Sequence, residues 1–293
     1  MMEDYLLRAI ATEARVRAIA CTTTELVKEG VRRHSASPVA TVALGQALTG
    51  AALMGSLLKM RQRIAIKWEG YDSRQKILVE SNSNGRIRGY ISGLETEAPL
   101  WQGQLDLLAL LGTDGLLTVV KDLRLEELVK GAVALPPGDV GNSLTYYLNQ
   151  SEQVLSLVVV GVQVAEDGSV AAAGGLLFQA LPSYEGDLLE QVEERLQEMP
   201  PVASLLHAGQ SLEDILAGVF GEVPFKVLAE RPLAFECSCS YKRTEQALIM
   251  LGPEEIAAIL ETEGQAVIDC HFCHEQYVVD RESLELLLAR FDS

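Results

Sequence analysis

The sequence predicts an α+β fold in which an N-terminal antiparallel-sheet domain with packed helices is followed by a helical, acidic linker and a small cysteine-containing domain. Three observations lead to this prediction. Turn signals at 82–85 and 166–168 each stand between two strand-like segments, which is the pattern of a β-hairpin. Residues 39–58 carry no charge and predict a buried helix. The charge then changes near residue 183, which predicts a separate C-terminal part.

The N-terminal residues predict a hairpin and a short helix. Apolar and β-branched residues dominate both ends of 5–21, and Thr24 is a candidate N-cap for a helix that runs to His34. Cys21 lies in the second strand of this hairpin and is expected to pack as a small buried hydrophobe rather than to act as a regulatory thiol. His34, like His207 further on, is expected to pack or to cap a helix rather than to act as a base.

The uncharged stretch 39–58 is long enough to span a bilayer, which takes roughly 20 residues. Its sequence nevertheless favours a buried helix of a globular domain, because polar residues interrupt it and Ala and Gly contribute little transfer energy. Ser37 and Pro38 form an N-cap and N1 pair, and Lys59 is the expected end. Three glycines would let neighbouring elements approach this helix closely: Gly45, Gly50 and Gly55.

Five further segments predict strands. Residues 63–68 alternate charged and apolar side chains, as a half-buried strand does. The segments 76–80 and 86–92 flank an Asn-Ser-Asn-Gly turn, and 155–164 and 170–179 flank a Glu-Asp-Gly turn. Each pair therefore predicts an antiparallel hairpin.

The segment 183–230 predicts three short helices. The first has leucines and a valine at helical spacing between 188 and 196 and stops at Pro200-Pro201. The second begins near Val202, and Ser211 opens the third. Because these helices are short, acidic and separated by prolines, we expect a linker of marginal stability.

Length and charge bound the function. The 293 residues predict two domains or three small ones, and the boundaries we expect are 1–182, 183–230 and 231–293. The net charge is −17, which argues against a dedicated nucleic-acid binder, because such a protein needs a basic face. Residues 1–182 carry only −2 of this charge and residues 183–293 carry −15.

The start of the chain shows no basic n-region ahead of an apolar run, so we expect no signal peptide and a cytoplasmic, reducing location. In that setting the five cysteines indicate metal ligands or reactive thiols before structural disulfides.

Four of these cysteines lie within 37 residues as C-x-C, thirty intervening residues and C-x-x-C. They are Cys237, Cys239, Cys270 and Cys273. Each pair can supply two sulfurs from one turn, and two helices expected at 244–251 and 253–261 can fold the spacer so that the turns meet. The pattern predicts one tetrahedral Zn²⁺ per chain, bound by four thiolates in a domain too small to fold securely without it. Lys242 and Arg243 are the nearest compensation for its negative charge.

Two alternatives compete with a four-thiolate site. The segment from Cys270 to His274 satisfies C-x-x-C-H, the attachment pattern of c-type haem, but that interpretation leaves Cys237 and Cys239 unexplained. His271 or His274 could also replace one thiolate in the zinc shell.

Thiolates are the sulfur species that peroxide and hypochlorous acid attack. On oxidation each sulfur would most readily meet its near neighbour, giving Cys237–Cys239 and Cys270–Cys273. Such bridges close very short loops and do not replace the zinc cross-link across the spacer. The domain should then unfold, loosen the linker before it, and expose apolar surface in an acidic surround that can bind unfolded proteins.

The cysteine pattern resembles that of the redox-regulated zinc heat-shock chaperone family, the 33 kDa chaperonins, and the resemblance covers nearly the full chain. Weaker matches follow in the expected order along the N-terminal domain: Arg33-His34, Ser37-Pro38, Ala43-Leu44-Gly45, Gly85-Arg86-Ile87-Arg88-Gly89-Tyr90, Tyr147-Leu148, Ser151-Glu152-Gln153 and Ala173-Gly174-Gly175 through Leu181-Pro182. The chain departs from the family at Tyr241-Lys242-Arg243, where many members have a charged Arg/Glu run, but no ligand is affected.

The resemblance implies an ATP-independent holdase that is inactive when reduced and zinc-bound and active when oxidised. It implies that the four cysteines bind zinc, that they form the two near-neighbour disulfides, and that the active form is a homodimer. Unfolded or oxidatively damaged client proteins would be its partners, with no nucleic acid and no membrane.

Two other functions remain open. A structural zinc ribbon that contacts ribosome or RNA would have to overcome the acidity of the C-terminal third. A thiol oxidoreductase using Cys270 and Cys273 lacks a thioredoxin-like βαβ pattern around the motif. We find no nucleophile–His–acid set, P-loop or GxGxxG, and expect Gly174 and Gly175 to mark a bulge or close packing within a strand, so the sequence does not predict an enzyme.

Overall fold

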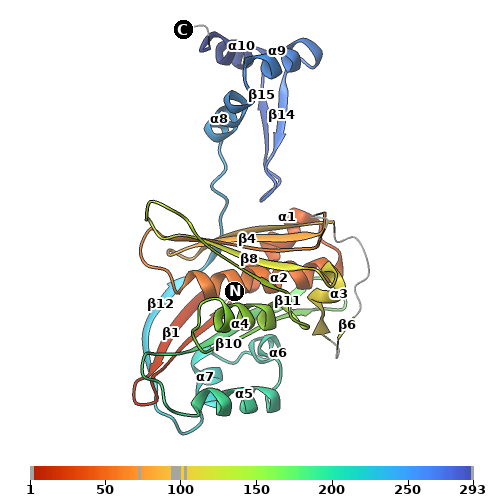
Figure 1. The fold of residues 1–293 in the computed structure, drawn as a ribbon. Coiled ribbons are helices and arrows are strands. Elements are labelled where there is room, and N and C mark those ends of the chain that lie inside the picture. Colours follow the sequence, from red (N-terminus) through yellow and green to blue (C-terminus); the bar gives the residue numbers. More distant parts are fainter. Residues whose placement is uncertain (1–2, 72–73, 94–99, 102–103, 292–293) are drawn as a thin grey trace. The chain divides into compact units, whose positions relative to one another are not determined.

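A computed structural model describes residues 3–71, 74–93, 100–101 and 104–291 of this chain. Residues 1–2, at the chain start where we expect no signal peptide, lie outside the described residues. The chain divides into two compact units, Met1–Glu236 and Cys237–Ser293 (Figure 1). The α+β prediction is confirmed, since both units combine antiparallel strands with helices.

The first unit contains two large sheets. One has five strands in the order β10-β11-β2-β1-β12, all antiparallel. Its strands are β1 (Tyr5–Ala11), β2 (Val16–Thr22), β10 (Ser156–Val164), β11 (Val170–Ala180) and β12 (Lys226–Pro232). The other has six strands in the order β13-β5-β4-β3-β8-β9. Its strands are β3 (Arg63–Glu69), β4 (Lys76–Asn82), β5 (Arg86–Ser92), β8 (Leu116–Asp122), β9 (Val129–Ala134) and β13 (Ala234–Phe235). A further pair, β6 (Leu100–Trp101) and β7 (Gln104–Leu105), forms a small ribbon.

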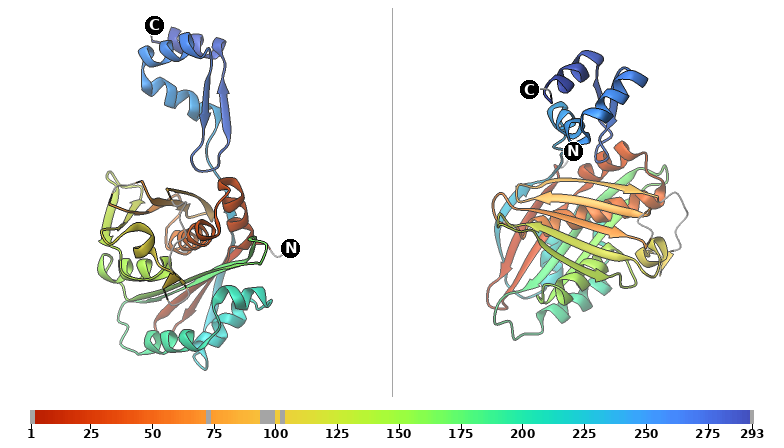
Figure 2. Two further views of the ribbon diagram at one scale, coloured as in Figure 1. Left: turned by 90° about the vertical axis from the view of Figure 1, so that its right-hand side faces the viewer. Right: turned by 45° about the horizontal axis from the view of Figure 1, so that its top comes forward.

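The long helix α2 (Pro38–Gly55) lies between these two sheets, where Figure 2 shows it nearly end-on in the left panel. By length and composition α2 could cross a membrane, but 83% of its residues are buried inside the fold. The expected close approach at its glycines is confirmed: a Cβ at Gly50 would lie 2.6 Å from Leu144 Cδ1, and one at Gly55 2.1 Å from Ser81 Oγ. Helices α1 (Thr24–His34), α3 (Leu107–Leu111) and α4 (Val140–Gln150) complete this layer.

Two helix ends differ from the prediction. Thr23, not Thr24, is the N-cap of α1, and its side chain makes no capping hydrogen bond. The carboxylate of Asp4 takes the place of the Thr23 side chain and accepts a hydrogen bond from the Leu26 amide at 2.6 Å. The local sequence of the helix does not reveal Asp4 as its capping residue. Helix α2 ends at Gly55 rather than Lys59, because residues 56–58 bond to carbonyls three positions back and tighten the last turn.

The acidic segment forms the three helices that the sequence predicts, α5 (Leu188–Glu198), α6 (Val202–His207) and α7 (Leu212–Phe220). They pack on the face of the five-stranded sheet opposite α2 (Figure 1). Their apolar side chains form a second core with the outward residues of β1, β2 and β11. The helices contribute Leu188, Leu189, Val192, Val202, Leu205, Leu206, Leu212, Ile215, Leu216, Val219 and Phe220 to this core.

The second unit is small. It consists of α8 (Tyr241–Leu251), α9 (Pro253–Thr262), the hairpin β14 (Ala266–Asp269) and β15 (Gln276–Val279), and α10 (Arg281–Ala289). The two spacer helices are therefore confirmed, with α8 starting earlier than expected because Ser240 caps it by accepting from the Arg243 amide. Its core comprises six buried side chains: Leu248, Ile256, Ala266, Val279, Leu284 and Leu287.

Candidate metal centre

The first cysteine pair lies directly ahead of α8. Ser240 caps that helix, so Cys237 and Cys239 occupy the extended segment that leads into a fixed helix start. Arg243, in the first turn of α8, donates from its Nη1 to the carbonyl and hydroxyl oxygens of Ser238, at 3.0 and 2.6 Å. The guanidinium therefore braces the C-x-C segment from within α8 and brings a positive charge beside it.

The second pair lies in the turn between β14 and β15. The Cys270 amide donates to the Glu275 carbonyl at 3.0 Å, and the Cys270 carbonyl accepts from the Cys273 and His274 amides at 3.3 and 2.8 Å. His274 has a positive φ of 54°, which lets the chain reverse directly after Cys273. These hydrogen bonds form one tight turn that contains both Cys270 and Cys273.

The fold brings the two pairs together. All four Sγ atoms lie within 4.8 Å of one another, and two close contacts join the pairs, from Cys237 to Cys270 at 3.6 Å and from Cys239 to Cys273 at 3.3 Å. In a tetrahedral zinc site with Zn–S bonds of about 2.3 Å the sulfurs lie about 3.8 Å apart. The donor set and its spacing therefore fit a four-thiolate metal site, which the sequence predicted from motif spacing alone.

The histidine alternative finds no support in the geometry. Among the residues that the structure describes, the group of possible ligands at this point comprises the four cysteines and does not include His271 or His274. Both histidine side chains are exposed, whereas Cys273 is only 4% exposed. The C-x-x-C pair also faces the C-x-C pair, which a haem attachment motif does not require.

Burial and hydrogen bonding set the electrostatics of the thiols. Burial raises the pKa of Cys273 far above its ordinary value, and burial also raises the pKa of Cys239. The hydroxyl of Tyr277 opposes the shift at Cys239 by donating to its Sγ at 3.1 Å. A divalent cation would reverse this preference, because its charge stabilises the thiolate over the thiol.

Tyr277 is the contact that the sequence did not reveal. It lies on β15 opposite Ile268 and reaches Cys239, 38 positions earlier in the chain. A lone tyrosine in a strand pattern carries no signal of such a contact, since the contact depends on how β15 packs near the C-x-C segment. The other sequence-predicted residues lie elsewhere: Cys21 is fully buried in β2, and His34 donates from Nε2 to the Gly89 carbonyl at 3.1 Å.

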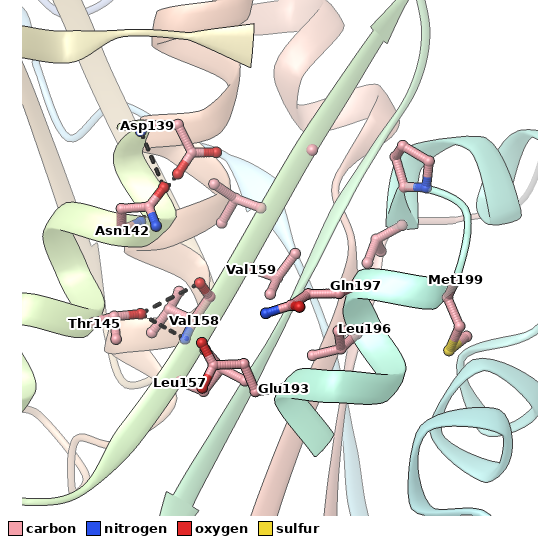
Figure 3. Close-up of a pocket in the computed structure, with 14 residues that line it drawn as sticks. Asp139, Asn142, Thr145, Leu157, Val158, Val159, Glu193, Leu196, Gln197 and Met199 are labelled. Carbon is pink, nitrogen blue, oxygen red and sulfur yellow. Dashed lines mark hydrogen bonds between the residues drawn. The ribbon is translucent and has the colours of Figure 1, made fainter. Parts of the chain in front are cut away.

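A cavity of about 520 Å³ in the first unit, beside β10, has no comparable chemistry (Figure 3). Two of its polar side chains, Asp139 and Thr145, already serve the fold. Asp139 caps α4 by accepting from the Asn142 amide at 3.0 Å and also accepts from Gln46 at 3.3 Å, and the Thr145 hydroxyl accepts from the Val158 amide at 2.8 Å.

Comparison with known proteins identifies the family. The Hsp33 protein family model matches residues 4–280. The chain belongs to the Hsp33 family. It is 44% identical over 287 residues to a 33 kDa chaperonin of Geobacter sulfurreducens, covering 98% of this chain and 95% of that one. It is 41% identical over 283 residues to a 33 kDa chaperonin of Bacillus subtilis, covering 96% and 97%.

A solved Hsp33 structure has the same fold. The crystal structure of the 33 kDa chaperonin from Thermotoga maritima superposes with a TM-score of 0.89 at 30% identity and covers 100% of both chains. The family resemblance stated from sequence is confirmed. This Hsp33 family member is therefore a chaperone and not an enzyme, and unfolded client proteins are its partners.

Proposed function

We propose that this chain is an ATP-independent holdase whose activity is switched by oxidation of the four-cysteine centre. In the reduced state Cys237, Cys239, Cys270 and Cys273 would hold one Zn²⁺ and the chaperone would rest. The observation that carries the proposal is the clustering of four sulfurs from two segments within 4.8 Å. When bound, zinc supplies a cross-link between those segments and holds the sulfurs as thiolates.

Oxidation by a peroxide converts the ligands into disulfides. Two thiolates give up two electrons to one H₂O₂, which takes two protons and leaves as two waters, and a second equivalent oxidises the other pair. Disulfide sulfurs carry no negative charge and are poor metal ligands. The proposed pairs are Cys237–Cys239 and Cys270–Cys273.

The choice of pairs decides whether the switch works. Near-neighbour disulfides leave the two segments untied, whereas Cys237–Cys270 and Cys239–Cys273 bridges would tie them as zinc does. Two close sulfur contacts in the reduced fold run across the segments, but the spread of 4.8 Å leaves every pair within reach after a side-chain rotation. The six-residue core of the second unit is too small to hold its fold once the cross-link is lost.

Loss of that fold would spread toward the helices before it. In the proposed division, 1–182 binds clients and dimerises, 183–230 is a metastable linker and 231–293 is the switch. Supporting this, α5 and α7 carry acidic residues on their outer faces, and all three helices bury apolar inner faces on the sheet. Release of these helices would uncover apolar surface inside an acidic surround that keeps the complex soluble.

We further propose that the oxidised form is a homodimer in the cytoplasm, where thiols are normally reduced. Neither nucleic acid nor membrane is a proposed partner. The acidity of the chain opposes nucleic-acid binding, and its longest apolar helix is a core helix.

The test uses purified reduced protein treated with peroxide at mild heat. Metal release is followed with a chromogenic chelator while suppression of thermal aggregation of a client is assayed in parallel. We expect about one zinc per chain to leave as activity rises, and a dithiol to reverse both. Cys21→Ala is the matched control, because it removes the fifth thiol without touching the centre and should switch normally.

Mapping the disulfides by mass spectrometry after oxidation checks the pairing. Bridges across the segments in the active protein would overturn the proposed mechanism. Metal loss without any gain of activity would instead show that the metal at this centre is purely structural. Catalytic turnover of a dithiol that survives replacement of Cys237 and Cys239 would show that the chain is an oxidoreductase.

A further inference from the structure

A short strand covers part of the β5 edge immediately before the cysteine centre. β13 (Ala234–Phe235) pairs with β5 in parallel. The Ala234 amide donates to the Gly85 carbonyl at 3.0 Å, and the Glu236 amide donates to the Ile87 carbonyl at 2.9 Å. The segment that leads into Cys237 is therefore added to the sheet as an extended strand.

The side chains of this segment rest on α1 and the core. Leu233 is only 7% exposed, and the Phe235 ring packs against the core with the Arg33 guanidinium 5.8 Å from its centroid. Gly30 leaves room for that ring, since a Cβ there would lie 3.4 Å from it and 2.8 Å from Leu48 Cδ1. We call this site the β5 slot; it is formed by Gly30, Arg33, His34 and residues 85–89.

The slot is longer than the strand that fills it. The carbonyls of Gly85, Ile87 and Gly89 lie two residues apart, as the acceptors of a parallel ladder do. β13 uses the first two, and the Nε2–H of His34 donates to the third at 3.1 Å. The chain's own strand goes no further because the residues after Glu236 belong to the cysteine centre.

Few polar interactions hold β13 in place. Besides the two ladder bonds, Glu236 pairs with Arg86, and both of these side chains are about half exposed, so solvent screens the pair. The preceding strand β12, by contrast, pairs with β1 from Tyr5–Pro232 to Ile10–Lys226. A disturbance that enters through Cys237 would therefore detach β13 before β12.

We propose that the β5 slot is a docking site for an extended segment of an unfolded client, covered by β13 in the resting protein and uncovered on oxidation. The client segment would carry apolar side chains two residues apart, as Leu233 and Phe235 are. This inference rests on the proposed redox function and adds a binding surface to it.

The seated strand defines the chemistry of the occupant. The β5 carbonyls form hydrogen bonds only with backbone amides of the bound segment. The slot can therefore bind segments of many sequences, as a chaperone must. Selectivity comes from the pocket for Leu233 and from the Arg33 guanidinium, which favours an aromatic ring at the position of Phe235. The slot thus binds chain that is both extended and apolar, a combination that folded proteins rarely expose.

Hydrogen exchange on the unaltered protein is the first test. On oxidation the amides of Ala234 and Glu236 should lose protection, while those of β12 that pair with β1 keep theirs. Addition of an unfolded client should restore slow exchange along the slot by protecting β5. Protection of Ala234 and Glu236 that persists in oxidised, active protein would overturn the proposal.

A peptide probe tests the slot directly. A fluorescent peptide with the sequence of residues 229–236 should bind oxidised protein about tenfold or more tightly than reduced protein. A peptide with serine at both apolar positions should not bind, and Arg33→Ala should weaken binding several-fold. Equal binding of the two peptides, or binding only through exchange of β13 between two copies of the chain, would count against a client site.

Loosening the strand should open the slot without an oxidant. Phe235→Ser is expected to give reduced protein that binds the peptide, and Leu228→Ser, on the 59% exposed position of β12, is the matched control that should not. Each sample is also assayed for suppression of client aggregation. Oxidised protein without that activity refutes the proposed function, whereas active protein that leaves the peptide unbound refutes the slot alone.

Discussion

The hydroxyl of Tyr277 donates a hydrogen bond to Cys239 Sγ. This bond is the main reason why the pKa of Tyr277 is raised well above its ordinary value. A donor on a thiolate withdraws charge from the sulfur and makes it a weaker nucleophile toward peroxide. The tyrosine therefore protects one ligand of the centre.

Tyr277→Phe keeps the ring and removes this donor. We expect reduced protein with this change to lose its thiols to peroxide faster, by no more than about 150-fold, the rate equivalent of the roughly 3 kcal/mol upper limit for one hydrogen bond to a charged group. Timed thiol titration measures the rate. Tyr241→Phe is the control, since that hydroxyl bonds to Ser283 and to no cysteine; an equal acceleration in both variants would contradict the assignment.

Asp4 gives a pH-dependent contribution to stability. Its carboxylate is 5% exposed and accepts from the Leu26 amide, but burial is the dominant effect and raises its pKa above the ordinary 3.8. The protonated form is thus favoured in the folded state. The contribution of protonated Asp4 to the free energy of unfolding is present in full below pH 3.8, the ordinary pKa, and is lost as the pH rises through the raised pKa of the folded state.

Asp4→Asn should remove this pH dependence while keeping an oxygen for the Leu26 amide. The free energy of unfolding, measured by urea titration from pH 4 to pH 7, should fall less steeply with rising pH in the variant than in the parent. Asp4→Ala, which leaves the amide without its partner, should be less stable than the parent at every pH by about 1–3 kcal/mol. If the free energy of unfolding of Asp4→Asn and that of the parent changed with pH in parallel, the raised pKa of Asp4 would be contradicted.

The ligands of the centre could be predicted and their neighbours could not. Close cysteine pairs are a local pattern, so Cys237, Cys239, Cys270 and Cys273 were expected together, and the clustering of their sulfurs follows from the turns that hold them. Tyr277 and Asp4 act on groups that are 38 and 22 positions away in the chain. No local spacing encodes such contacts.

At the scale of elements, one aromatic side chain with two ring contacts anchors the end of α7. The Phe220 ring packs edge-on against Phe178 of β11, with centroids 5.6 Å apart, and lies 5.1 Å from Phe225. Phe220 is fully buried, so this ring anchors the acidic helices to the sheet.

Phe220→Ala should destabilise the first unit by about 3–5 kcal/mol, the usual cost of an aromatic cavity. Because the cavity lies under α5–α7, reduced protein should also suppress client aggregation in part without an oxidant. Thermal unfolding and the aggregation assay measure the two effects. Leu125→Ala, at a 68% exposed position, should change neither; loss of stability with no gain in activity would separate these helices from the switch.

Elements with local signals were predicted, and those defined by a distant partner were not. The hairpins β4–β5 and β10–β11 carry their turn residues, β1–β2 carries apolar and β-branched strand residues, and α2 carries its cap. β12 exists only because β1 pairs with it from the far end of the unit, and β13 is two residues long. The sequence likewise did not show that α5–α7 form a core with the sheet.

At the scale of the whole molecule, the two units differ in what holds them. The first has two extensive cores, and the second has a core of six buried apolar side chains and the cysteine centre. A domain of this size rarely folds on its core alone. Metal should therefore stabilise the second unit selectively.

Chelation in the presence of a reductant tests this difference. A strong chelator should unfold the second unit and leave the first folded, so that limited proteolysis cuts near residue 236 and yields a stable fragment of the first unit. Intact mass spectrometry locates the cut. Protein that resists cleavage after complete metal removal, or that melts as one body, would show that the metal is not the main support.

Cys21 is fully buried in β2, and burial raises its pKa far above the ordinary value. Its sulfur is therefore silent toward a thiol reagent for as long as the sheet stays folded. The molecule thus contains two classes of thiol, and their reactivities can be measured in one sample. Thiols that react in buffer report the state of the centre, and the Cys21 thiol, which reacts only after denaturation, reports whether the first unit has stayed folded under the same oxidant.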